Sequence, residues 1–169
     1  MDPAVHLSFR YTETDYVRAM RAHYSSRLRV RLDIGIAVGL AIAGAYLLYS
    51  APMNWFGLFC IGASAAFALI LLAAFIVIPH YVFRTEPKLR DDYSLTLSPA
   101  GVHFRTAHID SQLQWSMYSR ALVDTYSYLL YYGSRSFSLI PRRVFESGEQ
   151  VAAFEQLLTQ HVLNIVRRP

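Results

Sequence analysis

Fifty consecutive residues, from Ile34 to Phe83, contain no Asp, Glu, Lys or Arg. The two flanking parts of the chain are charged at a density that is normal for soluble proteins. A disordered chain would not contain so long an apolar block, and a small soluble domain could not bury it. The net charge of +4 is too small to indicate a nucleic-acid-binding protein. We therefore expect a membrane protein with a water-soluble part and no nucleic-acid partner.

The uncharged block predicts two membrane helices, at 33–50 and 55–79, in a hairpin domain that covers 33–80. A bilayer core of roughly 30 Å needs about 20 helical residues, so the second segment spans it easily and the first only just. Pro52 and Asn54 favour a tight turn between them. Aromatic residues that suit a membrane interface gather at this turn, namely Tyr46, Tyr49, Trp55 and Phe56. The alternative is a soluble protein with two core helices, which a domain of this size could not cover on every side.

The charges that flank the hairpin predict its orientation. Five arginines lie between residues 18 and 31, three cations lie between residues 84 and 90, and the loop has no charge. Because Lys and Arg are enriched on the cytoplasmic side of membrane helices, we expect both termini in the cytoplasm and a multi-pass protein of the cell membrane. The single cysteine, Cys60, lies inside the second predicted helix, so neither a disulfide framework nor a zinc site is expected.

The N-terminal part, 1–32, is predicted to form a strand followed by a juxtamembrane amphipathic helix. Residues 5–11 alternate between apolar and polar side chains, which is typical of a half-buried strand. Thr12 and Asp15 then approximate a capping box at the start of the helix. Because the strand has no partner nearby in the sequence, we expect it to pair with a C-terminal sheet and to make a seventh strand there.

The C-terminal part, 84–169, is predicted to be a small antiparallel β domain closed by a helix. Short alternating segments bounded by turn residues indicate six strands, at 92–98, 102–106, 109–115, 121–126, 128–132 and 136–140. A second capping box, from Ser147 to Gln150, opens the closing helix, which is expected over 147–167. The predicted fold class is an α+β membrane protein, with a two-helix transmembrane hairpin and a cytoplasmic antiparallel β domain.

Several segments of the chain resemble those of a known family. They are YTETDYVRA before the apolar block and YSLTLSPAGVHFRT, LQWSMYSRALVDTYSYLLYYG and FSLIPRRVFES after it. Together they are similar to the YcxB-like family of small bacterial membrane proteins, over nearly the whole chain, and the most specific pieces are 114–116 and 139–145. The resemblance implies a C-terminal domain with a pleckstrin-homology-like (PH-like) fold, a bent sheet capped by one helix, in a bacterial inner membrane. It implies no activity, so no functional residue is carried over.

Two groups of residues are candidates for contacts with lipid, with a partner or between helices. Seven cations suit anionic headgroups or the acids of a partner: Arg27, Arg29, Arg31, Arg84, Lys88, Arg142 and Arg143. The alternative is that they are solvated charges and a topology signal. Four glycines offer small surfaces for helix packing: Gly35, Gly39, Gly44 and Gly62. They serve first to pack the hairpin on itself, and a face left over would bind another subunit, including a second copy of the chain.

Five aromatic residues are candidates for a packed core or for a protein interface: Trp115, Tyr126, Tyr128, Tyr131 and Tyr132. Alternation along a strand should bury some of the tyrosines and expose others. His103, His108 and Asp110 lie on adjoining predicted strands, but without a further strong ligand they do not predict a metal site. The sequence has neither a nucleophile elbow nor a metalloprotease helix. We therefore expect no catalysis and no cofactor.

Two functions fit these expectations. The first is a non-catalytic membrane adaptor, whose cytoplasmic domain binds a membrane or cytoplasmic protein. The second is a membrane-surface module that senses anionic lipid through the basic juxtamembrane belt and the β domain. The lipid bilayer is a partner in both, and the sequence favours the adaptor.

Overall fold

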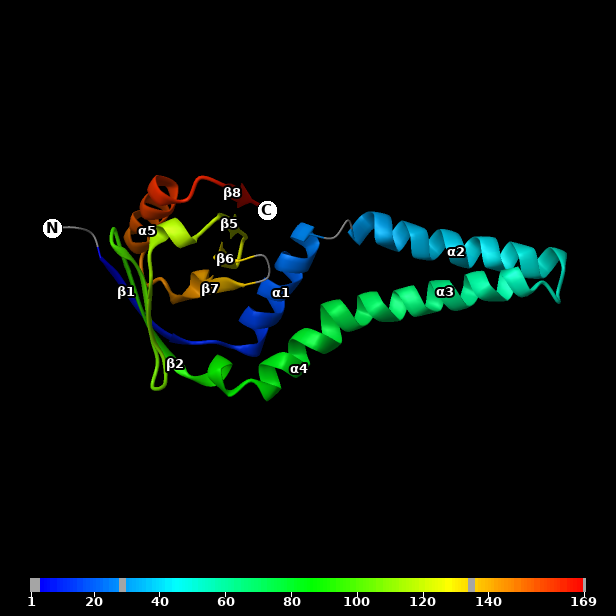
Figure 1. Cartoon of the computed structure of the whole chain (residues 1–169), viewed down its shortest axis with the longest axis horizontal. Coiled ribbons are helices and arrows are strands. Elements are labelled where there is room, and N and C mark those ends of the chain that lie inside the picture. The colour runs from blue at the N-terminus through cyan, green and yellow to red at the C-terminus, as the bar shows by residue number, and fades with distance from the viewer. Residues whose placement is uncertain (1–3, 28–29, 134–135, 169) are drawn as a thin grey trace. The chain divides into compact units, whose positions relative to one another are not determined.

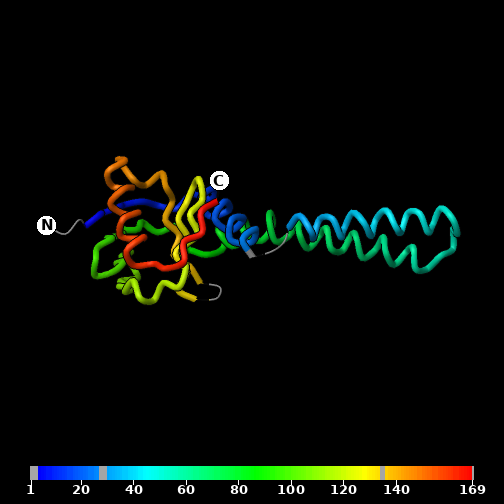
Figure 2. The backbone as a smooth tube through the Cα atoms, turned by 90° about the horizontal axis from the view of Figure 1, so that it is seen from above, coloured from blue at the N-terminus to red at the C-terminus, as the bar shows by residue number. Residues whose placement is uncertain are grey.

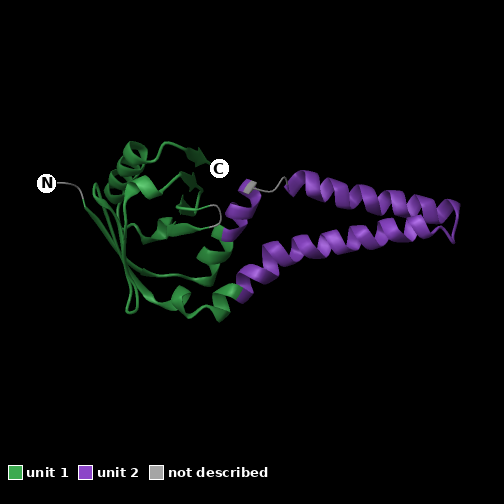
Figure 3. Ribbon diagram, in the orientation of Figure 1, with its two compact units in different colours: residues 1–19, 82–169 green, residues 20–81 purple. Residues whose placement is uncertain are grey.

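The computed structural model of the chain describes residues 4–27, 30–133 and 136–168. The contacts within the chain divide it into two units, which Figure 3 draws in different colours. Unit 1 combines residues 1–19 with residues 82–169, and unit 2 is the intervening segment, residues 20–81. Unit 1 is therefore assembled from both flanks of the uncharged block, although these flanks are far apart in the sequence.

Unit 2 contains two apolar helices that run side by side in opposite directions (Figure 2). They are α2 (Val30–Ser50) and α3 (Trp55–Leu72). The side chain of Asn54 caps α3, because its Oδ1 accepts hydrogen bonds from the backbone N–H of Phe56 at 3.0 Å and of Gly57 at 3.4 Å. The two helical segments, residues 30–50 and 55–85, are each long and apolar enough to cross a membrane.

The second apolar helix continues beyond its predicted end at residue 79. A wide π-helical turn, η1 (Ala73–Val77), joins α3 to α4 (Ile78–Thr85). In a regular α-helix the N–H of residue 79 would donate to the carbonyl of residue 75, but Pro79 has no N–H. Arg21 of α1 (Glu13–Arg27) donates from Nε to this Phe75 carbonyl at 3.0 Å. The arginine thus satisfies a carbonyl that the proline leaves without its usual donor.

The first sheet of unit 1 joins the segment before the apolar helices to the segment after them. It contains β1 (Val5–Arg10), β2 (Asp92–Ser98), β3 (Gly101–Arg105) and β4 (Asp110–Leu113), in that order and all antiparallel (Figure 1). All six residues of β1 pair with β2, from Val5 opposite Leu97 to Arg10 opposite Asp92. The expectation that the N-terminal strand joins a C-terminal sheet is confirmed.

The second sheet corrects two expectations about the C-terminal part. It contains β5 (Arg120–Val123), β6 (Ser127–Tyr131), β7 (Phe137–Pro141) and β8 (Ile165–Arg167), in the order β7-β6-β5-β8. The described strands therefore form two four-stranded sheets instead of one run of seven, and β8 was not predicted. β8 also pairs in parallel with β5, whereas an antiparallel domain was expected.

The closing helix, α5 (Gly148–His161), is shorter than the predicted 147–167. The side chain of Ser147 caps it, since its Oγ accepts the N–H of Gln150 at 3.2 Å. At Val162 the backbone turns extended, with φ −111° and ψ 114°, and the chain continues into β8. The spacing of Val162 and Ile165 fits a helix, but the adjacent β-branched pair Ile165 and Val166 favours a strand, and pairing with β5 decides the outcome.

The core of unit 1 is formed by apolar side chains of both sheets and of α5. All five residues of β6 are buried. From α5, Phe154, Leu157 and Leu158 are buried, and the ring of Phe154 meets the ring of Tyr128 edge to face, with centroids 4.9 Å apart. A strand buried along its whole length cannot show the apolar–polar alternation of a half-buried one.

Candidate functional site

Two adjacent arginines form a polar corner of unit 1. They belong to the short 3₁₀ helix η4 (Arg142–Val144), which follows β7 directly because Pro141 stops the strand. Arg142 extends towards α5, and Arg143 extends towards the start of α1. Both side chains were candidates for lipid or partner contact, and the fold supplies each with a carboxylate from the same unit.

Glu155 of α5 is the acidic centre of the Arg142 side of the corner. Its carboxylate accepts hydrogen bonds from Tyr128 Oη at 2.7 Å, Arg142 Nη2 at 3.0 Å and Arg167 Nη1 at 3.2 Å. Burial alone would raise the pKa of Glu155, but the bonds from Tyr128 and Arg167 and the charges of both arginines outweigh it and lower the pKa. Burial and the bond to Glu155 raise the pKa of the Tyr128 hydroxyl. Glu155 is therefore held as an anion between fixed donors.

Asp15 of α1 is the acidic centre of the Arg143 side. Arg143 Nη2 donates to Asp15 Oδ2 at 2.6 Å, Arg143 Nε reaches both carboxylate oxygens, and Arg143 Nη2 also donates to the Arg10 carbonyl at 2.8 Å. Asp15 and Thr12 form the predicted capping box, with reciprocal bonds of 2.9 and 3.2 Å. Burial would raise the pKa of Asp15, but these hydrogen bonds outweigh it and lower the pKa. The arginine thus joins the segment before the apolar helices to the segment after them.

Tyr11 reinforces the same junction from inside the domain. Its hydroxyl donates to the carbonyl of Leu139 in β7 at 2.5 Å, and burial strongly raises the pKa of that hydroxyl. The ring lies against the rings of Phe9 and Tyr93, with centroids 5.1 and 4.8 Å away. The N-terminal segment is therefore packed into unit 1 by both polar and aromatic contacts.

The other predicted cations occupy different surroundings. Arg84 Nε lies 3.1 Å from Glu13 Oε1, and Lys88 Nζ lies 3.4 Å from Glu86 Oε2. Arg31 is exposed on α2. Arg29 lies outside the described residues, as does the side chain of Arg27. Among the described cations of unit 1, the structure thus brings Arg142 and Arg143 together at one corner and gives Arg84 and Lys88 other carboxylate partners.

The predicted aromatic residues divide into core and surface. Tyr128 and Tyr131 are buried in β6, and Trp115 is buried in the 3₁₀ helix η3 (Trp115–Met117) rather than at a strand end. The indole N–H of Trp115 donates to the Ser98 carbonyl at 2.7 Å. Tyr126 and Tyr132 are exposed. The guanidinium of Arg18 lies 4.2 Å above the Tyr126 ring, and the Tyr132 ring meets the ring of Tyr118 edge to face, with centroids 6.2 Å apart.

Of the four predicted glycines, Gly44 is the one that lies where α2 meets α3. A Cβ at Gly44 would lie 2.9 Å from the Gly57 carbonyl oxygen, so the two backbones approach closely there. Ser64 donates to the Ala37 carbonyl at 2.8 Å in the same contact, which also buries Cys60. A Cβ at Gly35, Gly39 or Gly62 would meet nothing within 4 Å, so these three glycines do not pack the hairpin.

The histidine cluster does not form a metal site. His103 Nε2 lies 2.5 Å from Asp110 Oδ1 across the β3–β4 pair, and within residues 4–27, 30–133 and 136–168 no group of three His, Cys, Asp or Glu side chains could hold a metal ion. The hydrogen bond and charge of His103 lower the pKa of Asp110 against a small opposing effect of desolvation. The pair is a surface contact of the strand edge.

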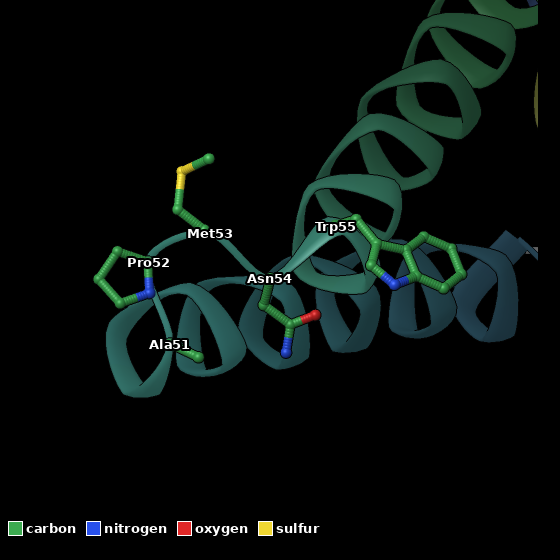
Figure 4. A pocket seen from close by; sticks show the side chains of 5 residues that line it. All are labelled: Ala51, Pro52, Met53, Asn54 and Trp55. Carbon is green, nitrogen blue, oxygen red and sulfur yellow. The ribbon is translucent and has the colours of Figure 1, made fainter.

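A shallow hollow lies on the loop between α2 and α3 (Figure 4). Its lining is Ala51, Pro52, Met53, Asn54 and Trp55. The Met53 and Trp55 side chains extend away from the loop and are exposed. The hollow is wide open and mostly apolar, so it resembles an interfacial surface more than a ligand site.

Comparison with known proteins identifies part of unit 1. The model of a protein family described as YcxB-like protein matches residues 97–158. The chain contains a YcxB-like domain. The match begins near the end of β2 and stops within α5, so the YcxB-like domain includes the Arg142–Arg143 corner and Glu155. The segments outside the match include β1, α1, the apolar helices and β8, so the match is narrower than the nearly full-length resemblance that was expected. No curated protein and no solved structure matches the chain.

The sequence did not predict which carboxylates pair with Arg142 and Arg143, namely Glu155 and Asp15. Asp15 was recognised as a capping residue, but its contact with Arg143 joins positions 128 residues apart. Glu155 gave no local signal beyond its place on the polar side of a helix. The pairing of residues 5–10 with residues 92–97 is the clue that could have placed Asp15 near the corner.

Proposed function

We propose that the chain is an integral membrane protein with two spans and a non-catalytic adaptor domain, PH-like in fold, on the cytoplasmic side of the cell membrane. The observation that carries the membrane part is the exposed apolar surface of unit 2. Ile42, Phe59 and Leu69 are 65%, 62% and 64% exposed. Such a surface is unfavourable in water and favourable in a bilayer, and the helices satisfy their own backbone hydrogen bonds, as hydrocarbon requires.

The connectivity of the chain supports two spans rather than one. Both flanks of unit 2 belong to unit 1, where β1 pairs along its whole length with β2. A single domain lies on one side of a membrane, so a chain that leaves this domain through α2 must cross back before β2. The flanking cations and the uncharged loop favour the cytoplasm for unit 1.

The layout of unit 1 supports the PH-like part of the proposal. A four-stranded antiparallel sheet is followed by three consecutive antiparallel strands, β5 to β7, and then by a helix whose apolar side chains cover the core. The family resemblance implies a bent antiparallel sheet capped by one helix, and this layout has the cap while its strands divide into two sheets. β8 is an addition to it.

The adaptor part of the proposal rests on the contacts that the charged side chains of unit 1 make with one another. Asp15 and Glu155 each accept several hydrogen bonds, and their arginine partners tie separate segments together. These contacts stabilise the fold and do not present a reactive group. The exposed large apolar and aromatic side chains of unit 1 are the features that a partner protein would contact: Ile109, Met117, Tyr126, Tyr132 and Leu163.

The same contacts count against the lipid-sensing alternative. Arg84, Arg142 and Arg143 each have a carboxylate partner within unit 1. A lipid phosphate would have to displace these partners, and at Arg143 it would have to replace a multidentate contact. We therefore place the function of the domain in protein binding.

The test is purification from native membranes in mild detergent, followed by mass spectrometry of the bound proteins and lipids. We expect a stoichiometric protein partner that is lost from the double variant Met117→Ala, Tyr132→Ala, because both side chains are exposed on unit 1. Arg84→Ala is the matched control and should retain the partner. A lone protein with enriched anionic lipid would favour the lipid-sensing function, and a lone protein without enriched lipid would contradict both.

A further inference from the structure

The segment after α5 covers an edge of the second sheet with its own short strand. β8 is the outer strand in the order β7-β6-β5-β8, and it follows α5 after a three-residue turn (Figure 1). Its residues pair in parallel with β5: Ala121 with Ile165, Leu122 with Val166 and Val123 with Arg167. Every other strand pair described in the chain is antiparallel.

The β5 edge recognises this strand through the main chain. The N–H of Ala121 donates to the Asn164 carbonyl at 2.8 Å, and the N–H of Arg168 donates to the Val123 carbonyl at 2.8 Å. Because alternate residues of a strand turn their backbone groups to the same side, the N–H and C=O of Val166 also face β5. Main-chain recognition of this kind accepts many sequences, so selectivity must come from side chains.

Side chains of the segment add a definite pattern. Ile165 and Val166 are half-buried, whereas Arg167 is exposed and places Nη1 3.2 Å from Glu155 Oε2. Glu155 is also held by Tyr128 and Arg142, so its carboxylate keeps its position and charge when Arg167 leaves. The edge therefore selects two apolar residues followed by a basic one.

Several features make β8 a replaceable occupant of this edge. It has three residues, and parallel pairing is slightly weaker per residue than antiparallel pairing. The preceding turn contains a fully exposed Leu163. Beneath β8, Ala121, Leu122 and Val123 of β5 are buried and belong to the YcxB-like domain, whereas β8 lies outside the family match. The β5 edge thus belongs to the YcxB-like domain, whereas β8, the strand that covers this edge, lies outside it.

We propose that the β5 edge binds an extended segment of a partner protein, with an apolar–apolar–basic pattern and parallel to β5, and that β8 occupies this site until the partner displaces it. The inference rests on the adaptor function proposed above and names the class of its partner. Strand addition of this kind supplies main-chain affinity, and Glu155 supplies the charge selection. β8 then keeps the site closed in the absence of the partner.

The test measures binding of a labelled synthetic peptide, residues 162–168 of this chain, to the full chain in detergent. Val166→Pro removes an N–H that faces β5 and should open the edge. Leu163→Pro is the control, because Leu163 is fully exposed and follows Val162, whose extended backbone suits a following proline. We expect the peptide to bind Val166→Pro at least tenfold more tightly than the wild type or the control. A peptide with Arg167→Glu should bind Val166→Pro at least tenfold more weakly than the unchanged peptide.

A second form of the protein guards against failure of the proline variant to fold. A protease site inserted after Leu163 allows the chain to fold with β8 in place, and cleavage then frees the edge for the labelled peptide. Equal peptide binding before and after cleavage, or equal binding of the charge-reversed peptide, would overturn the inference. The peptide assay uses no partner protein, so a negative result would overturn the proposal for the β5 edge and leave the adaptor function standing. The absence of a co-purifying partner would instead contradict the adaptor function.

Discussion

Gly101 is the residue whose backbone most clearly requires glycine. Its φ is +145°, and a Cβ there would lie 2.4 Å from the Leu113 carbonyl oxygen of the neighbouring β4 segment. We expect Gly101→Ala to lower the free energy of unfolding of unit 1 by about 2–3 kcal/mol, because it combines an unfavourable φ with a backbone clash. Urea denaturation in detergent, followed by Trp115 fluorescence in a Trp55→Phe background, measures the change.

The matched control for this prediction is Gly148→Ala. A Cβ at Gly148 would meet nothing within 4 Å, and the residue begins α5, where alanine is favourable. The free energy of unfolding should change by no more than about 0.5 kcal/mol. Similar destabilisation by the two substitutions would contradict the account of the β2–β3 turn.

The contact between Asp15 and Arg143 predicts a pH dependence of stability. The folded-state pKa of Asp15 is lowered, so the carboxylate stabilises unit 1 above its unfolded pKa of about 3.9, and this stabilisation is lost as the pH falls through the folded value. Asp15→Asn should therefore cost about 1–2 kcal/mol at neutral pH, allowing for the half-exposed Arg143, and this cost should shrink as the pH is lowered from neutral through the folded pKa of Asp15. Urea denaturation across this pH range compares the variant with the wild type.

Asp92→Asn serves as the control for this titration. Asp92 is an exposed carboxylate at the start of β2, so its replacement should change the free energy of unfolding by no more than about 0.5 kcal/mol. A constant difference between Asp15→Asn and the wild type at every pH would show that the Asp15 carboxylate does not stabilise the fold through its charge.

At the scale of single residues, sequence reasoning located cations and aromatics more reliably than their partners. The capping role of Asp15 follows from a local pattern and is confirmed. Its contact with Arg143 depends on sheet pairing across the whole uncharged block, which composition and spacing do not encode. Tyr128 and Tyr131 were placed on a strand, but burial of both faces of that strand depends on how the second sheet and α5 pack.

At the scale of elements, the contact between α2 and α3 depends on Gly44. A side chain there would meet the Gly57 carbonyl oxygen and Ile61 at 2.9 Å and Cys60 at 3.1 Å. Gly44→Leu should therefore separate the helices locally and raise the rate at which maleimide labels Cys60, the single cysteine, severalfold in detergent. Gly39→Leu is the control, because that position is open, and it should leave the rate unchanged. Equal rates in the two variants would contradict the assigned contact.

Most helices and strands could be predicted from the sequence, whereas the residues at which they begin and end were harder to predict. β2 occupies the predicted residues, because alternation and a following Pro-Ala-Gly turn are strong local signals. The C-terminal helix was predicted six residues too long, because apolar residues at helical spacing continue into a segment that pairs with β5. Of the predicted small-residue surface, Gly44 lies against α3, whereas a Cβ at Gly35 or Gly39 would meet nothing within 4 Å, since helix rotation and not the GxxxG spacing decides which face of α2 meets α3.

At the scale of the whole molecule, the two flanks of the apolar helices build one domain. Charge distribution alone predicted the division into an apolar part and charged flanks. The lone strand at 5–11 predicted a pairing with the C-terminal sheet, in which β2 is its partner. The separation into two sheets and the parallel β8 were not predictable, because both depend on contacts between distant segments. The family match, at residues 97–158, lies within the part of the domain that follows the apolar helices and leaves out β8.

The labelling of single cysteines from the two sides of a membrane tests the central claim most directly. In a Cys60→Ala background, Thr14→Cys and Glu149→Cys place exposed thiols on the two flanks, and Met53→Cys places one on the 94% exposed loop residue between the apolar helices. An impermeant maleimide added to oriented vesicles should label Thr14→Cys and Glu149→Cys from the same side and Met53→Cys from the opposite side. Labelling of all three from one side, or of Thr14→Cys and Glu149→Cys from different sides, would contradict a two-span protein with one adaptor domain.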